Sequence, residues 1–145
     1  MQRILASAVV ALVPLVAAAD PVVVTGTGTV SETVDRLKAS IKSAGARVFG
    51  VFDFGGGIRS IGKDVGEVQL VIFGDPRIGA EALSADRMAA LDLPGKILVY
   101  DTAEGSAMAY QQPAEMLAEW DIPADAAVLE AMSGTLASVT AGAAR

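Results

Sequence analysis

The chain has 145 residues, of which 52% are hydrophobic and 19% charged, so it holds enough apolar material for one folded domain. Its net charge of −6 argues against nucleic acid as a partner, because such a surface repels phosphate backbones. Cysteine and histidine are both absent, which excludes disulfides and removes the usual general base and the commonest transition-metal ligand. We therefore expect no metal site and no cofactor.

Residues 1–19 have the three-part pattern of a secretory signal peptide. A basic start at Arg3 precedes the apolar residues 4–16, and three alanines end at a cleavage site after Ala19. The apolar stretch is too short for a helix that crosses a bilayer core of about 30 Å. We expect export to the periplasm or the medium, and a mature chain without a membrane span. The single domain is then predicted over residues 20–132.

The first predicted elements are a strand over residues 22–25 and a helix that follows it. Thr29 and Glu32 form a capping-box pattern at the start of this helix. Apolar residues then recur every three or four positions, which is typical of an amphipathic helix. They are Val30, Val34, Leu37, Ile41 and Ala44.

The middle of the chain predicts two more strands separated by a glycine-rich loop. Residues 47–54 are aromatic and β-branched, and residues 67–73 end in a wholly apolar run. Residues 55–57 are three glycines, predicted as a flexible loop, and residues 58–64 form one helical turn or continue the loop. Leu70 is assigned to a central strand, so Leu70→Asp is expected to unfold the domain.

The second half predicts a helix, a strand hairpin and further helices. Residues 77–90 are expected to be helical, either without interruption or with a break at Ser84, and Met88 and Leu91 are expected to face inward. A hairpin joins strands at residues 96–101 and 106–110. Helices follow at about 112–120 and after 122, and the Ala/Gly-rich residues 133–145 predict a helix end that fades into a frayed tail. The predicted fold class is α+β: one curved, mostly antiparallel five-stranded sheet with helices packed on one face.

Four segments in fixed order resemble a known family. They are TVSETVDRLKASIKSAGARVFGVFD, VIFGDP, LDLPGKILVYD and AYQQPAEMLAE. Across residues 22–120 the chain resembles the bacterial and archaeal family called domain of unknown function 302. The resemblance implies a fold similar to one copy of the TATA-binding-protein fold with added helices, often dimeric. It implies neither DNA binding nor an established activity.

The chain departs from that family at two positions. Members commonly have a His after the Asp of the second strand, where this chain has Phe54. A family role for that imidazole in metal or haem ligation is therefore not expected here. The phrase usually read as Gly-Asn-Pro is here Gly74-Asp75-Pro76, which keeps the turn and adds a charge.

The candidate ligand-binding residues are polar or aromatic groups near strand ends. Two neighbouring carboxylates can share a proton or bind a cation, and a guanidinium matches the geometry of an anionic ligand. The set is Asp53, Phe54, Asp75, Arg77, Tyr100 and Tyr110. No catalytic residue is assigned.

Three functions stay open. The leading hypothesis is a non-enzymatic exported domain that binds a small molecule or a protein partner as a homodimer, because an uncovered sheet face needs a partner. The second is an enzyme that uses Asp53 with Asp75 or Asp101, with or without a divalent cation. A separation of more than about 10 Å between Asp53 and Asp75 would remove its basis. The third is a structural or stress-related interaction protein.

Overall fold

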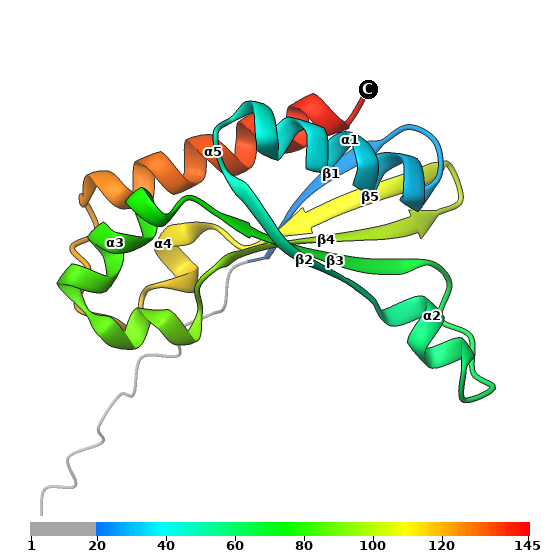
Figure 1. The fold of residues 1–145 in the computed structure, drawn as a ribbon, viewed down its shortest axis with the longest axis horizontal. Coiled ribbons are helices and arrows are strands. Elements are labelled where there is room, and N and C mark those ends of the chain that lie inside the picture. Colours follow the sequence, from blue (N-terminus) through cyan, green and yellow to red (C-terminus); the bar gives the residue numbers. More distant parts are fainter. Residues whose placement is uncertain (1–19) are drawn as a thin grey trace, which may run out of the picture.

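The computed structural model describes residues 20–145, so the predicted signal peptide lies outside the described residues. The chain forms one sheet and several helices around it (Figure 1). The strands are β1 (Val22–Gly26), β2 (Arg47–Asp53), β3 (Val68–Gly74), β4 (Gly95–Thr102) and β5 (Gly105–Tyr110). The helices are α1 (Val30–Ser43), α2 (Phe54–Arg59), α3 (Pro76–Ala85), the 3₁₀ helix η1 (Arg87–Leu91), α4 (Pro113–Met116) and α5 (Ala127–Ala143).

The strand order in the sheet is β1-β5-β4-β3-β2, and every neighbouring pair is antiparallel. The predicted α+β class and the five-stranded sheet are therefore confirmed. Helices α1 and α5 lie side by side over one face of the sheet, while α3, η1 and α4 gather at one end (Figure 1). We call the face under α1 and α5 the covered face, and the opposite one the open face.

Helix α1 begins where the capping box predicts. The Thr29 side chain accepts a hydrogen bond from the Glu32 backbone, and the Glu32 carboxylate accepts one from the Thr29 backbone at 2.9 Å. These bonds satisfy two of the N–H groups that a helix start leaves without partners. The predicted apolar stripe is buried against the sheet up to Ile41, whereas Ala44 is exposed.

The three glycines at 55–57 form helix α2 instead of the predicted loop. Asp53 caps this helix by accepting a hydrogen bond from the Gly56 backbone at 2.7 Å. Gly55 packs against the carbonyl of Gly66, and a side chain at position 55 would collide with that oxygen. Close packing here therefore overrides the low helix propensity of glycine.

The predicted helix over 77–90 is two elements, α3 and η1, that meet at Asp86. The Asp86 carboxylate accepts a hydrogen bond from the Met88 backbone and so starts η1. The expectation that Met88 and Leu91 face inward is wrong: their exposed fractions are 50% and 68%. The change from α to 3₁₀ geometry turns these side chains away from the core, and a single helical period could not show this change.

A frayed tail was predicted for residues 133–145. These residues instead continue helix α5 as far as Ala143. Leu136, Val139 and Ala143 are buried in the core, although this segment has no clear apolar period. Gly142 lies against Ser40 of α1, and a Cβ at position 142 would meet the Ser40 hydroxyl. Small residues therefore let α5 approach α1 closely. The other C-terminal prediction, a helix over 112–120, is realised only as the short α4.

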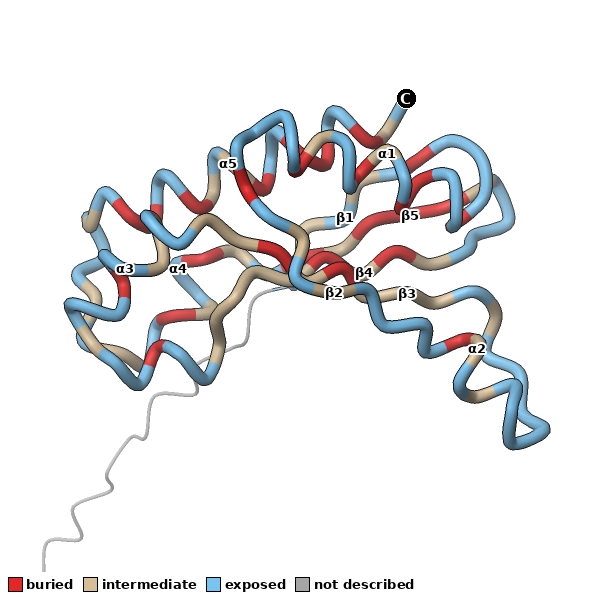
Figure 2. Tube along the Cα trace, in the orientation of Figure 1, coloured by how far each residue is buried: buried red, intermediate tan, exposed pale blue. Residues whose placement is uncertain are grey.

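Buried apolar residues form two clusters. The larger one lies between the covered face and helices α1 and α5, where buried residues recur along both helices (Figure 2). The smaller one joins α3, η1, α4 and the first half of α5, with Trp120 packed against it. The indole N–H of Trp120 donates a hydrogen bond to Asp92 at 2.7 Å.

Candidate functional site

The structure places the predicted site residues at separate points of the sheet. Asp53 pairs with Gln69 at the start of β3, whereas Asp75 follows the last residue of the same strand. At about 3.3 Å per residue, the Cα atoms of these aspartates lie ~20 Å apart. Helices α2 and α3, which these aspartates cap, are accordingly at opposite ends of the molecule (Figure 1). An Asp53–Asp75 carboxylate pair therefore has no geometric basis.

Asp53 and Asp101 lie toward the same end of the sheet, but each carboxylate accepts a backbone hydrogen bond. Asp101 accepts from the Glu67 backbone at 2.9 Å, and Asp53 caps α2. Phe54 begins α2 and is 47% exposed. Within residues 20–145, no group of three or more acidic side chains is arranged to hold a metal ion.

Asp75 and Arg77 are brought together as an ion pair. An Nη atom of Arg77 donates to Asp75 at 2.7 Å, its Nε atom lies 3.1 and 3.2 Å from the two carboxylate oxygens, and the Arg77 backbone donates at 2.9 Å. These hydrogen bonds and the charges of Arg77 and Arg47 hold the pKa of Asp75 below its ordinary value. Asp75 therefore stays ionised at neutral pH.

The two tyrosines belong to different faces. Tyr100 pairs with Val68 and Ala107 on the open face and is half-buried. Tyr110 is 8% exposed and packs in the larger cluster near Val22. The two rings do not line a common pocket.

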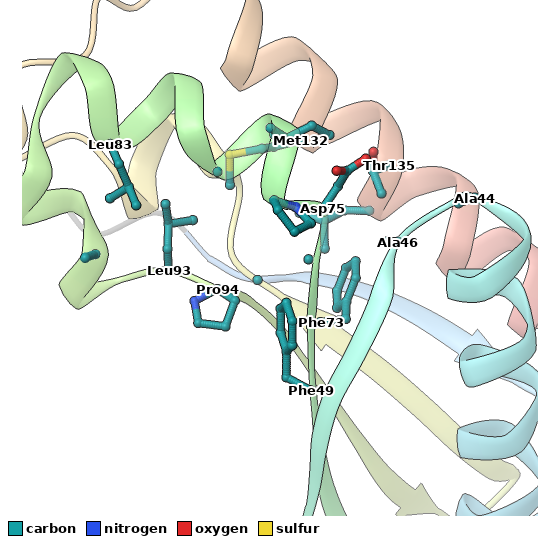
Figure 3. Close-up of a pocket in the computed structure, with 17 residues that line it drawn as sticks. Ala44, Ala46, Phe49, Phe73, Asp75, Leu83, Leu93, Pro94, Met132 and Thr135 are labelled. Carbon is teal, nitrogen blue, oxygen red and sulfur yellow. The ribbon is translucent and has the colours of Figure 1, made fainter.

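A cavity of about 500 Å³ opens between the end of the sheet and helices α3 and α5 (Figure 3). We call it the apolar cavity, because hydrophobic side chains and backbone make most of its wall. The wall comprises Ala44, Ala46, Phe49, Phe73, Gly74, Asp75, Pro76, Ile78, Gly79, Leu83, Ala90, Leu93, Pro94, Gly95, Met132, Thr135 and Leu136.

An irregularity in β2 brings Phe49 to the cavity. Val48 pairs with Phe73 and Gly50 pairs with Ile72, so Phe49 is an extra residue in the strand. Such a bulge interrupts the alternation of side chains and redirects one of them. The Phe49 ring lies against Gly74, where a Cβ would approach it to 3.3 Å. Phe49 is left 56% exposed at the cavity edge.

The polar side chains of the cavity wall are already hydrogen-bonded. Asp75 accepts from Arg77, and the Thr135 hydroxyl donates to the carbonyl of Ala131 at 2.8 Å. Both side chains are labelled in the close-up of the cavity wall in Figure 3. The wall would therefore discriminate between ligands mainly by their shape and by how well they replace water.

Of the cavity wall, the sequence pointed only to Asp75. The remaining side chains are apolar residues that in a sequence are indistinguishable from core. Gly79 within α3 was the available signal, because a helical glycine is unfavourable unless space or a contact requires it. A Cβ at position 79 would meet no other atom within 4 Å, so Gly79 leaves room in the cavity.

The open face is a second candidate site. Directly paired residues point to the same side of a sheet. One such row runs Val23–Ala109–Leu98–Leu70–Phe52 across all five strands. The neighbouring rows add Thr25, Ala107, Tyr100, Val68, Lys96, Ile72 and Gly50. Val23 and Phe52 are each 54% exposed.

Comparison with known proteins gives both curated relatives and a solved structure. The chain is 36% identical over 76 residues to "Fluoride-specific ion channel FluC 1" of Brucella suis biovar 1 (strain 1330), covering 52% of this chain and 30% of that protein. The protein of the same name from Brucella abortus biovar 1 (strain 9-941) matches at the same identity, with 28% of its length covered. The chain thus matches less than a third of the length of these relatives. Among residues 20–145, no helix is long and apolar enough to cross a membrane.

The fold is similar to a solved structure. The crystal structure of the uncharacterized conserved protein DUF302 from Bacillus stearothermophilus superposes with a TM-score of 0.78 at 21% identity, covering 86% of this chain and 98% of that one. At this identity the similarity concerns the fold alone. Residues 22–139 match the family described as domain of unknown function DUF302. Since this match spans nearly the whole described chain, the protein belongs to the DUF302 family.

Proposed function

We propose that this protein is an exported binding domain that holds a small, largely apolar molecule in the apolar cavity. The cavity volume of about 500 Å³ is the observation that carries the proposal. Sites for small organic ligands fall in a range of about 300–1,000 Å³ and are lined mainly by apolar groups.

Exposed apolar side chains in the wall support this proposal. Phe49 and Leu83 are 56% and 39% exposed, so both leave apolar surface in contact with water. Burial of such surface stabilises a complex by roughly 25 cal/mol per Å². A bound apolar molecule would therefore gain affinity from surfaces that the fold leaves uncovered.

The wall favours binding over catalysis. Its carboxylate, Asp75, accepts several hydrogen bonds from Arg77 and keeps its charge at neutral pH. A general base needs a pKa near the working pH and a lone pair directed at the substrate. The pKa of Asp75 is lowered, away from neutral pH, and its carboxylate oxygens already accept hydrogen bonds from Arg77.

Gly79→Leu tests the cavity directly. The added side chain enters open space, and leucine is a better helix former than glycine, so the fold is retained. We expect the variant to lose binding of the neutral fluorescent probe N-phenyl-1-naphthylamine. Gly134→Leu is the matched control: Gly134 is also helical with open space around it, but lies outside the cavity wall. Equal probe binding by the two variants would overturn the proposal.

The open face supports a second part of the proposal: that two copies of the chain associate through it. The charged residues of this face are Lys96 and, through its pairing with Gly74, Arg47, so the face is positive although the chain carries a net charge of −6. Two like-charged copies therefore repel each other least when these faces meet. A twofold-symmetric contact uses the same patch on both copies, which suits a face of this kind. Analytical ultracentrifugation of the purified protein should give the dimer mass, and a monomer at micromolar concentration would contradict this part.

Export rests on the pattern of residues 1–19 alone. Production of the full chain in a bacterium should yield a periplasmic protein whose intact mass corresponds to residues 20–145, with a net charge of −7 after loss of Arg3. An uncleaved cytoplasmic product would contradict export.

Fluoride conduction, named for the Brucella relatives, does not form part of the proposal. The apolar cavity offers few hydrogen-bond donors for a small, strongly hydrated anion.

A further inference from the structure

We infer that the ligand of the apolar cavity is an amphiphile with an anionic head group, whose apolar body lies in the cavity and whose head binds Arg77 beside Arg47. This inference rests on the proposed function and adds the chemical class of the ligand. Its basis is the arrangement of charge at one edge of the cavity wall.

Arg77 stands at that edge. Its guanidinium binds Asp75, which lines the cavity. The same Nη atom also approaches the turn between α1 and β2, where it would lie 3.8 Å from a Cβ built on Gly45. The residues on either side of Gly45, Ala44 and Ala46, also line the cavity. The guanidinium therefore lies between two parts of the same wall.

Arg77 keeps donors for a ligand. A guanidinium has five N–H groups, and Asp75 occupies the Nε atom and one Nη atom. The other Nη group has no acceptor among the described residues, and the Arg77 side chain is 82% exposed. Asp75, by contrast, is 12% exposed and accepts all the contacts that Arg77 makes. A ligand head would therefore meet donors more readily than the carboxylate.

Arg47 gives this edge a net positive charge. It pairs with Gly74, the residue directly before Asp75, and its charge acts on the Asp75 carboxylate. The charges of two guanidinium groups thus act on one carboxylate, which leaves this edge with one net positive charge in a chain whose net charge is −6. A carboxylate or a phosphate head complements such a site, because both accept paired hydrogen bonds from a guanidinium.

The test compares decanoate with 1-decanol, which share an apolar tail and differ in the charge of the head. Dissociation constants are measured by titration calorimetry on the purified protein, below the concentration at which decanoate forms micelles. Arg77→Gln should weaken decanoate binding about threefold to fivefold, the size expected of an exposed ion pair, and leave 1-decanol unchanged. Asp75→Asn should strengthen decanoate binding, because it releases the Arg77 donors while asparagine still caps α3.

The outcomes separate the inference from the proposed function. If both probes bind and respond equally to the two substitutions, the cavity binds ligands but the anionic head is refuted. If Gly79→Leu abolishes binding of both probes, the site is the apolar cavity. The proposed binding site is refuted if neither probe binds the unmodified protein. It is also refuted if the Gly79→Leu variant binds both probes as tightly as the unmodified protein. In either case the inference about the head group is refuted as well.

Discussion

The two faces of the sheet carry similar apolar side chains but differ in what covers them. Ile97 and Leu98 are neighbours in β4: Ile97 is completely buried beneath the helices, while Leu98 points to the open face and stays half-buried. An apolar run in a strand supplies both faces at once, because successive side chains alternate. How much each face contributes to stability therefore depends on what packs against it: helices of the same chain on the covered face and, in our proposal, a second copy on the open face.

The largest expected effect is the difference between Val71→Asp and Leu70→Asp, which place the same charge on the two faces of β3. Val71 is completely buried on the covered face, so an aspartate there should unfold the domain at a cost of several kcal/mol. Leu70 lies on the open face, where the aspartate can reach water in a single copy. Leu70→Asp should therefore keep a cooperative melt and prevent the proposed association of two copies.

Thermal melts by circular dichroism and sedimentation of both variants check this prediction. A Leu70→Asp protein that unfolds as completely as Val71→Asp would show that the two faces contribute alike to the fold of one copy. A dimer that persists in Leu70→Asp would place the contact between copies elsewhere.

Val139→Ala sharpens the role of α5 as a cover. Val139 is completely buried between α5 and the sheet, and loss of its two methyl groups should cost about 2 kcal/mol in free energy of unfolding. Ser138, the residue before Val139 in the helix, is exposed, so Ser138→Ala should change that free energy by less than about 0.5 kcal/mol. Urea denaturation measures both, and equal values would mean that this half of α5 contributes nothing as a cover.

Thr29→Ala tests the start of the other covering helix. It removes the hydroxyl that accepts from the Glu32 backbone, and loss of such a cap costs about 1 kcal/mol. Thr29→Ser retains the hydroxyl and should remain close to the unmodified protein in the same denaturation experiment. No difference between the two substitutions would show that the capping box does not stabilise α1.

The smallest expected effect is a loss of stability in acid. Hydrogen bonds from Thr29 lower the pKa of Glu32, and hydrogen bonds from Arg77 lower the pKa of Asp75. A lowered pKa in the folded state means that stability is present above the ordinary pKa values, near 4, and is lost as the pH falls through the folded-state values. The melting temperature should therefore fall between about pH 5 and pH 2. Asp75→Asn should have a shallower decline, and an unchanged slope would contradict the role assigned to Asp75.

The candidate site was only partly predictable. Asp75 and Arg77 stand out in the sequence because Asp75 belongs to a Gly-Asp-Pro turn and Arg77, two residues later, carries the opposite charge. Phe49, Leu83 and Met132 do not, because an apolar residue at a cavity and one in a core have the same sequence pattern. The expected role of Leu70 shows the same limit: its strand was predicted, but the face to which it points was not.

The local structure could be predicted from the residues alone: the strands, the capped helix α1, the antiparallel hairpin of β4 and β5, and the family. Local hydrogen bonds and the alternation of side chains specify these features over short distances along the chain. Three features became visible only in the folded chain: residues 55–57 are helical, α5 extends to Ala143, and a cavity remains beside helices α3 and α5. Close packing acts between segments far apart in the chain, and it can therefore override local propensity and leave volume unfilled.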